Sequence, residues 1–528
     1  MANRANLVNL DAMIIREDFA VKSSQTPAHY DKQDKISVRD FAADGLLGSL
    51  LRKPDFQRET NHWTPEQVVS LLECYVDGDL IPSVILWQSE TATFVIDGGH
   101  RLSVLRAWVE DDYGDGHLSL SYFGTELSKE QKRVASRTRQ LVESRIGRWS
   151  TLQKKAKDSL AEDEKKRLNI ISTRALPIQW VNGDVDKAEA SFFKINTKGT
   201  PLDNIEELLL KNRHKPIAIA ARAIIRSGKG HKYWSAFDNE AAEKIEESAK
   251  KINELLFDPE LQSPIKTLDL PLGGSRGMRT AIQTLIDLCI IANRDQSGQP
   301  RTLSDTSDDS NGSGTLKALQ RTRALVERVT GNSAGSLGLH PAVYFYGPSG
   351  RHSSYMFMGA MQLIAQKAAN NDSNFFKKFT SVRQELERVL IEKKDLLSTI
   401  IQRHISVRRA SVYAEILDYT IQQLRDKHSP TDSDLVSIAN LEGKIVVGTP
   451  VTTSIDFSDD VKSQTFITSA ISSAQCCTIC GGYLDPTKSI SYDHAKDKKH
   501  GGKGNLSNCN MTHPYCNTAY KNCNESPK

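Results

Sequence analysis

The sequence of 528 residues lacks long apolar runs and has few cysteines outside its C-terminal end. No stretch reaches the roughly 18 apolar residues that a membrane-spanning helix needs, so we expect no membrane partner. We see no secretion signal at the N-terminus, which predicts a cytoplasmic protein with reduced thiols. Charge is nearly balanced, since 69 Lys and Arg face 65 Asp and Glu for a net charge of +4. A nucleic-acid partner would have to be attracted by a local basic patch.

Six of the eight cysteines lie in the last 53 residues, and four ligand-type residues there form two pairs. Cys477 and Cys480 have two residues between them, and so have His513 and Cys516. Two such pairs can close a tetrahedral structural Zn²⁺ site. A tail of roughly 50 residues buries too little apolar surface to fold alone, so we expect a structural metal. The alternative is a disulfide cluster, which the reduced thiols of a cytoplasmic protein disfavour. Cys476 is an alternative first ligand, with three residues between it and Cys480.

Residues suited to phosphodiester hydrolysis lie between the two ligand pairs. Asp493 and His494 end a predicted strand. A neutral imidazole can take a proton from water, and a neighbouring carboxylate can hold a divalent cation. The basic glycine turn at 498–502 suits close approach of a phosphate. Asn508 follows, 14 residues after His494.

In this order and spacing the tail resembles an HNH endonuclease of the ββα-metal, treble-clef type. The resemblance implies that His494 is the general base and that Asp493 binds a catalytic metal, Mg²⁺ or Mn²⁺. It implies that Asn508 braces the loop that carries the base, with Asn505 as a weaker candidate. Asn517 stands where the family has its last His, which implies the second ligand of the catalytic metal. The alternative is a zinc module that binds nucleic acid without cutting it.

A second group of residues surrounds a predicted strand in the N-terminal part, Thr93 to Asp97. This strand runs through a glycine turn into a predicted helix. Such a junction can bind anions, because free backbone N–H groups point at the ligand and the helix dipole favours negative charge. The candidate anion-binding residues are Gln57, Arg58, Asp97, Gly98, Gly99, His100, Arg101 and Asn196. The alternatives are a turn with a solvated Arg101 and a salt-bridged loop at Gln57 and Arg58.

Taken in order, these residues resemble the N-terminal domain of GmrSD-type, modification-dependent restriction enzymes, which has a ParB/sulfiredoxin-like fold. The resemblance implies that the domain binds a nucleoside triphosphate and regulates the nuclease joined to it. The family signature Asp-Gly-Gln-Gln-Arg is altered here, since Gly99 and His100 replace the two glutamines. The sequence leaves open which nucleotide is bound and whether it is hydrolysed.

The predicted fold is an α+β multidomain protein. Its predicted parts are an N-terminal extension (1–35), a ParB/sulfiredoxin-like α/β domain (36–213), an α-helical middle (214–430) with a flexible loop (296–314), a linker (431–473) and a C-terminal HNH domain with structural zinc (474–528). Long helices are expected in the middle part, for example at 241–256, 374–403 and 407–427.

These features predict a metal-dependent DNA endonuclease that a nucleotide-binding domain regulates, for restriction or anti-phage defence. The expected partners are a nucleotide and foreign or modified DNA, and a homo-oligomer is left open. One alternative is a nucleotide-sensing protein that binds nucleic acid without cutting. Another is an RNase, because this site chemistry does not itself choose the sugar.

Overall fold

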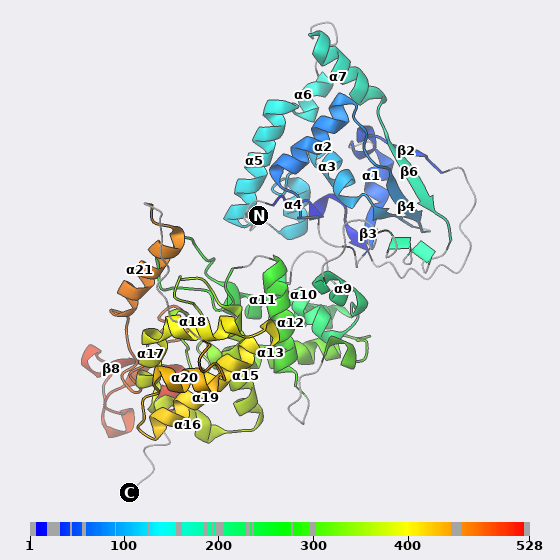
Figure 1. The fold of residues 1–528 in the computed structure, drawn as a ribbon. Helices are drawn as coiled ribbons and strands as arrows, with labels where there is room; N and C mark the ends of the chain where they lie inside the picture. The colour runs from blue at the N-terminus through cyan, green and yellow to red at the C-terminus, as the bar shows by residue number, and fades with distance from the viewer. Residues whose placement is uncertain are drawn as a thin grey trace. The chain divides into compact units, whose positions relative to one another are not determined.

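The computed structural model divides into two compact units, residues 1–213 with 229–233 and residues 214–228 with 234–528 (Figure 1). The structure describes residues 7–17, 32–42, 45–54, 57, 60–89, 91–124, 127–154, 161–183, 187–188, 191–192, 195, 204–228, 233–234, 237–275, 278–294, 302–444 and 456–521. No helix among these residues is long and apolar enough to cross a membrane.

The first unit is built on a mixed six-stranded sheet. Its strand order is β1 (Arg16–Glu17), β3 (Leu51–Pro54), β5 (Thr93–Asp97), β4 (Val84–Gln88), β6 (Leu176–Val181) and β2 (Lys35–Ile36). The β1–β3, β3–β5 and β4–β6 pairs are parallel, and the β4–β5 and β2–β6 pairs are antiparallel. The central strands are rich in buried β-branched and aromatic residues, which suit a sheet interior. The strand predicted at Thr93 to Asp97 is confirmed.

Helices cover the sheet of the first unit (Figure 1). They are α1 (Leu46–Leu50), α2 (Pro65–Asp77), α3 (Gly99–Glu110), α4 (His117–Phe123), α5 (Lys129–Arg145), α6 (Trp149–Lys154) and α7 (Glu162–Thr173), with 3-10 turns at Asp11–Met13 and Val38–Phe41. Helix α9 (Asn204–Lys211) follows near the end of this stretch of the chain. Helix α2 packs against α3, α5 and α7. It begins after Thr64, whose hydroxyl accepts the N–H of Gln67, and it ends at Gly78 in the left-handed region.

The second unit is mainly helical. Its helices are α10 (Pro216–Ile225), α11 (Asn239–Phe257), α12 (Met278–Ala292), α13 (Ser313–Val329), α14 (Pro341–Tyr344), α15 (Ser354–Ala369), α16 (Ser373–Ser381), α17 (Arg383–Glu392), α18 (Lys394–Arg403), α19 (Ser406–Arg425), α20 (Asp432–Ile438) and α21 (Asp459–Ile471). Within the predicted loop 296–314, the described part holds a 3-10 turn at Leu303–Asp305 and the start of α13. Within the predicted linker, α20 and α21 are helical.

The stretch 374–403, predicted as one helix, forms the three helices α16, α17 and α18. The backbone leaves the helical conformation at Val382 and Lys393. Neither break has a Gly or Pro to mark it in the sequence. Each short helix buries its own apolar face, which one straight helix of that length could not turn toward the same core.

The C-terminal tail forms a small two-stranded region inside the second unit. Strands β7 (Ser491–His494) and β8 (Cys509–Thr512) pair antiparallel, and a π-helical turn follows at Cys516–Tyr520. Backbone groups join this region to the helices: the N–H of Gly331 donates to Ser489 Oγ at 2.8 Å, and the N–H of Tyr515 donates to the carbonyl of Ser336 at 2.9 Å. The tail therefore shares the hydrogen-bond network of the helical part.

Candidate functional site

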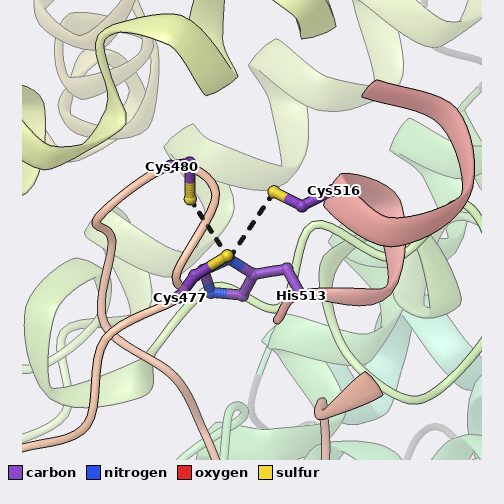
Figure 2. Close-up of side chains that lie close together, drawn as sticks. All are labelled: Cys477, Cys480, His513 and Cys516. Carbon is purple, nitrogen blue, oxygen red and sulfur yellow. Dashed lines mark hydrogen bonds between the residues drawn. The ribbon is translucent and has the colours of Figure 1, made fainter. Parts of the chain in front are cut away.

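The four residues predicted as zinc ligands lie together (Figure 2). One ligand atom from each of Cys477, Cys480, His513 and Cys516 lies within 4.8 Å of the others. His513 Nδ1 is 3.3 Å from Cys480 Sγ and 3.9 Å from Cys516 Sγ. Three thiols and one imidazole form a donor set that structural zinc sites use. The residues therefore fit a zinc ion.

The backbone around Cys477 forms the tight turn that such a site requires. The N–H of Cys477 donates to the carbonyl of Gly482 at 2.8 Å, and the N–H of Gly481 donates to the carbonyl of Cys477 at 2.9 Å. Gly481 has a φ of +69°, where glycine is favoured. Cys476, the alternative ligand, is exposed and lies outside the cluster, and Cys509 is also exposed.

The ring of His513 is oriented by its second nitrogen. Nε2 lies 3.0 Å from the carbonyl of Tyr483, which can only accept, so Nε2 carries the proton and Nδ1 has a free lone pair. Burial lowers the pKa of His513, and the positive charge of Arg383 lowers it further. Hydrogen bonds from Cys480 and Cys516 lower the pKa of Cys477, and the same contacts raise the pKa of Cys480 and Cys516. A neutral imidazole and an ionised thiol are the forms that bind zinc.

Asp493 and His494 lie at the end of β7, between the two pairs of zinc ligands in the sequence. Asp493 pairs with Asn510, and His494 pairs with Cys509. The side chain of His494 is partly exposed, so solvent reaches it. The hairpin thus displays an imidazole and a carboxylate from adjacent residues at the end of one strand.

The side chain of Asn508 holds the loop that follows His494. Its Oδ1 accepts the N–H of Lys496 at 2.6 Å, and its Nδ2 donates to the carbonyls of Lys496 and Lys503 at 3.1 and 2.8 Å. Gly502 lies against the same loop, because a Cβ there would be 1.7 Å from the carbonyl oxygen of Lys496. Among the described residues, the side chain of Asn505 accepts one hydrogen bond, from the hydroxyl of Ser507. Asn508 is therefore the residue that braces this loop.

Contacts of Asp493 and Asn517 join β7 to the helical turn at Cys516–Tyr520 and to Lys521 directly after it. Both carboxylate oxygens of Asp493 accept from Lys521 Nζ, at 3.0 and 2.9 Å, and the same ammonium donates to the carbonyl of His494 at 3.2 Å. The side chains of Lys521 and Asp493 are 23 and 12 % exposed. Asn517 Nδ2 donates to Ser491 Oγ at 2.8 Å. Lys521 was not predicted, although its spacing of four residues from Asn517 places both on one helical face.

Exposed lysines surround the tip of the loop between the two strands. Lys496, Lys498, Lys499 and Lys503 are all exposed there, and Asp497 is the acidic residue among them. This is the local basic surface that the balanced total charge requires for a nucleic-acid partner.

In the first unit, the candidate nucleotide residues gather where β5 enters α3. Arg101 Nη2 lies 2.6 Å from Asp97 Oδ2. Gly98 has a φ of +98°, and a Cβ there would be 2.6 Å from Val84 Cγ1. A Cβ on Gly99 would lie 3.6 Å from the amide of Gln57, so the backbone and that amide are neighbours.

His100 joins this group through its ring. The ring stacks on Trp63, with ring centroids 5.5 Å apart, and lies 5.9 Å from the ring of His62. Arg58 and Asn196, also predicted for this pocket, lie outside the described residues.

A buried ionic cluster that the sequence analysis did not predict contacts Gln57. Arg16 and Lys53 are both fully buried and both pair with Asp11, with Lys53 Nζ 2.9 Å from Asp11 Oδ1. Arg16 Nε also donates to the carbonyl of Gln57 at 3.2 Å. Burial lowers the pKa of Arg16, but the charge and hydrogen bond of Asp11, together with Tyr122 and Tyr233, raise that pKa well above the usual value.

Comparison with known proteins supports the resemblance of the N-terminal part. Residues 38–215 match the family described as GmrSD restriction endonuclease, N-terminal domain. No curated protein and no solved structure matches the chain. The match lies before the C-terminal tail, so the interpretation of the tail rests on its residues and their geometry.

Proposed function

We propose that this protein is a metal-dependent DNA endonuclease of the HNH type, in which the N-terminal domain binds a nucleotide and regulates cutting. The observation that carries the proposal is the hairpin β7–β8, where Asp493 and His494 lie between the two halves of a zinc-type cluster and Asn508 braces the next loop. The match of residues 38–215 to a restriction-endonuclease domain independently supports a role in restriction.

In the proposed mechanism, His494 takes a proton from the attacking water. Asp493 and Asn517 would hold the catalytic divalent metal, which stabilises charge on the phosphate and the leaving oxygen when bound. Both oxygens of Asp493 contact Lys521 Nζ, so the metal would have to replace this ammonium as the partner of the carboxylate. Asn508 keeps the loop after His494 in one conformation, which fixes the base relative to the phosphate.

In the first unit, the N-terminus of α3 would bind the phosphates of the nucleotide. Gly98 and Gly99 let the backbone approach an anion closely, and the Asp97–Arg101 pair supplies fixed charges beside it. We propose a nucleoside triphosphate as the ligand and foreign or modified DNA as the substrate of the whole enzyme.

The test is relaxation of supercoiled plasmid by the full chain with Mg²⁺ or Mn²⁺. His494→Ala should abolish cutting while zinc content and DNA binding persist. His428→Ala is the matched control, because His428 is an exposed histidine of the helical part, and it should cut at the wild-type rate. Equal activity of both variants would refute the assignment of the base.

Two other functions give different results in the same assay. A protein that only binds nucleic acid would bind the plasmid without cutting it, and His494→Ala would bind it as the wild type does. An RNase would cut a single-stranded or duplex RNA of matched sequence and leave the plasmid intact.

A further inference from the structure

The helical part contains a buried ion pair that contacts the zinc cluster. Arg383 and Glu387 lie one turn apart on α17, with Arg383 Nε 2.7 Å from Glu387 Oε1. Their side chains are 1 and 0 % exposed. A buried pair of charges is costly unless further hydrogen bonds satisfy it, so the partners of this pair indicate what it holds in place.

Three partners of the pair are backbone groups of two separate loops, and a fourth is the hydroxyl of Tyr344, which donates to Glu387 Oε1 at 2.9 Å. Arg383 donates to the carbonyls of Leu337 and Gly338, at 2.5 and 2.9 Å. Glu387 Oε2 accepts the N–H of Tyr483 at 2.6 Å. One loop precedes α14 and the other follows the first pair of zinc ligands, so the ion pair joins both of them to α17.

Both loops contact His513 directly. The carbonyl of Tyr483 accepts the proton on His513 Nε2, so the residue that Glu387 holds by its N–H holds the imidazole by its carbonyl. Gly338 packs against the ring itself, since a Cβ there would be 2.9 Å from His513 Cδ2. The orientation of His513 therefore depends on the ion pair through two routes.

The cysteine side of the cluster is in contact with the same pair. Gly482 lies so close that a Cβ there would be 2.6 Å from Arg383 Nε. Arg383 also interacts electrostatically with Cys480 and Cys516. Zinc with three thiolates and one neutral imidazole carries a net charge of minus one, so a guanidinium beside two of the thiolates offsets that charge.

We propose that Arg383 and Glu387 are positioning residues for the zinc centre, which keep both halves of the cluster in ligating geometry. Zinc affinity is then a property of the helical part as well as of the four ligands. The proposal rests on the proposed function only in that zinc holds the hairpin that carries Asp493 and His494.

The experiment measures zinc affinity of the full chain by competition with a chromophoric chelator. Glu387→Gln and the double variant Arg383→Met with Glu387→Met should each bind zinc about 10- to 100-fold more weakly, the usual effect of losing an outer-shell partner. The double variant leaves no unpaired buried charge, so it should fold even if a single variant does not. Arg388→Met is the matched control, because Arg388 lies on the same helix in an exposed pair with Glu385, and it should keep wild-type affinity.

Cobalt substitution gives a readout that general destabilisation would not move. The visible Co²⁺ spectrum of the wild type should show tetrahedral ligation by three sulfurs and one nitrogen, and folded Glu387→Gln should show a changed spectrum. Arg383→Lys keeps the charge but cannot reach both carbonyls. It should therefore bind zinc more tightly than the double variant and more weakly than the wild type.

Wild-type zinc affinity in the folded double variant would overturn the proposal, and so would a wild type without affinity for zinc. Plasmid cutting is measured beside these assays. If the variants bind zinc more weakly but the wild type does not cut, the positioning role is supported and the nuclease is refuted. If the wild type cuts but the variants bind zinc as tightly as the wild type does, only the positioning role is refuted.

Discussion

Replacing Asn508 by Ala tests the idea that a braced loop fixes the catalytic base. The change removes three hydrogen bonds from its side chain to the backbone of Lys496 and Lys503. Each contributes about 1 kcal/mol net, so the ordered loop loses about 2–3 kcal/mol. At about 1.4 kcal/mol per factor of ten, cutting should fall roughly 30- to 140-fold. The zinc cluster lies elsewhere in the module, so zinc content should not change.

The assay is single-turnover nicking of plasmid at saturating Mg²⁺, with zinc content measured on the same samples. Asn505→Ala is the control, because among the described residues its side chain makes a hydrogen bond with Ser507 alone, and it should cut nearly as fast as the wild type. Gly502→Ala should resemble Asn508→Ala, since its Cβ would collide with the carbonyl of Lys496, whereas Gly504→Ala has open space. Wild-type cutting by both Asn508→Ala and Gly502→Ala would refute the reasoning.

Three further outcomes are expected. Lys521→Met should bind Mn²⁺ severalfold more tightly in an EPR titration, because no ammonium competes for Asp493, and weaker binding would contradict this. Arg101→Met should weaken nucleotide binding about tenfold by calorimetry, through loss of a charge-assisted contact near the phosphates. Burial lowers the pKa of His352 to about 4. The unfolded chain therefore binds more protons below about pH 6.5, and thermal stability should fall from there toward pH 4, less steeply in His352→Gln.

The zinc ligands could be predicted from the sequence because metal geometry constrains their spacing. Two residues between ligands in each pair already indicate one site, and the structure brings all four side chains together. The strand Thr93 to Asp97 was equally accessible, since its apolar run ends at a glycine turn.

The residues that surround the zinc cluster could not be predicted from the sequence in the same way. Arg383 and Glu387 precede the first zinc ligand by about 90 residues, and a charged pair on a helix usually indicates an exposed face. Only the fold shows that these two charges are buried against Tyr483. The breaks at Val382 and Lys393 have no Gly or Pro, so apolar periodicity alone could not divide that helix.

The most direct test of the proposed function is cleavage of modified phage DNA by the full chain with Mn²⁺, with and without nucleoside triphosphates. Metal-dependent cutting whose rate changes with nucleotide, and which His494→Ala abolishes, is the predicted result. Cutting that persists in His494→Ala would contradict the assigned chemistry. Zinc-loaded protein that binds these DNAs and cuts none of them would contradict the nuclease and leave a binding module.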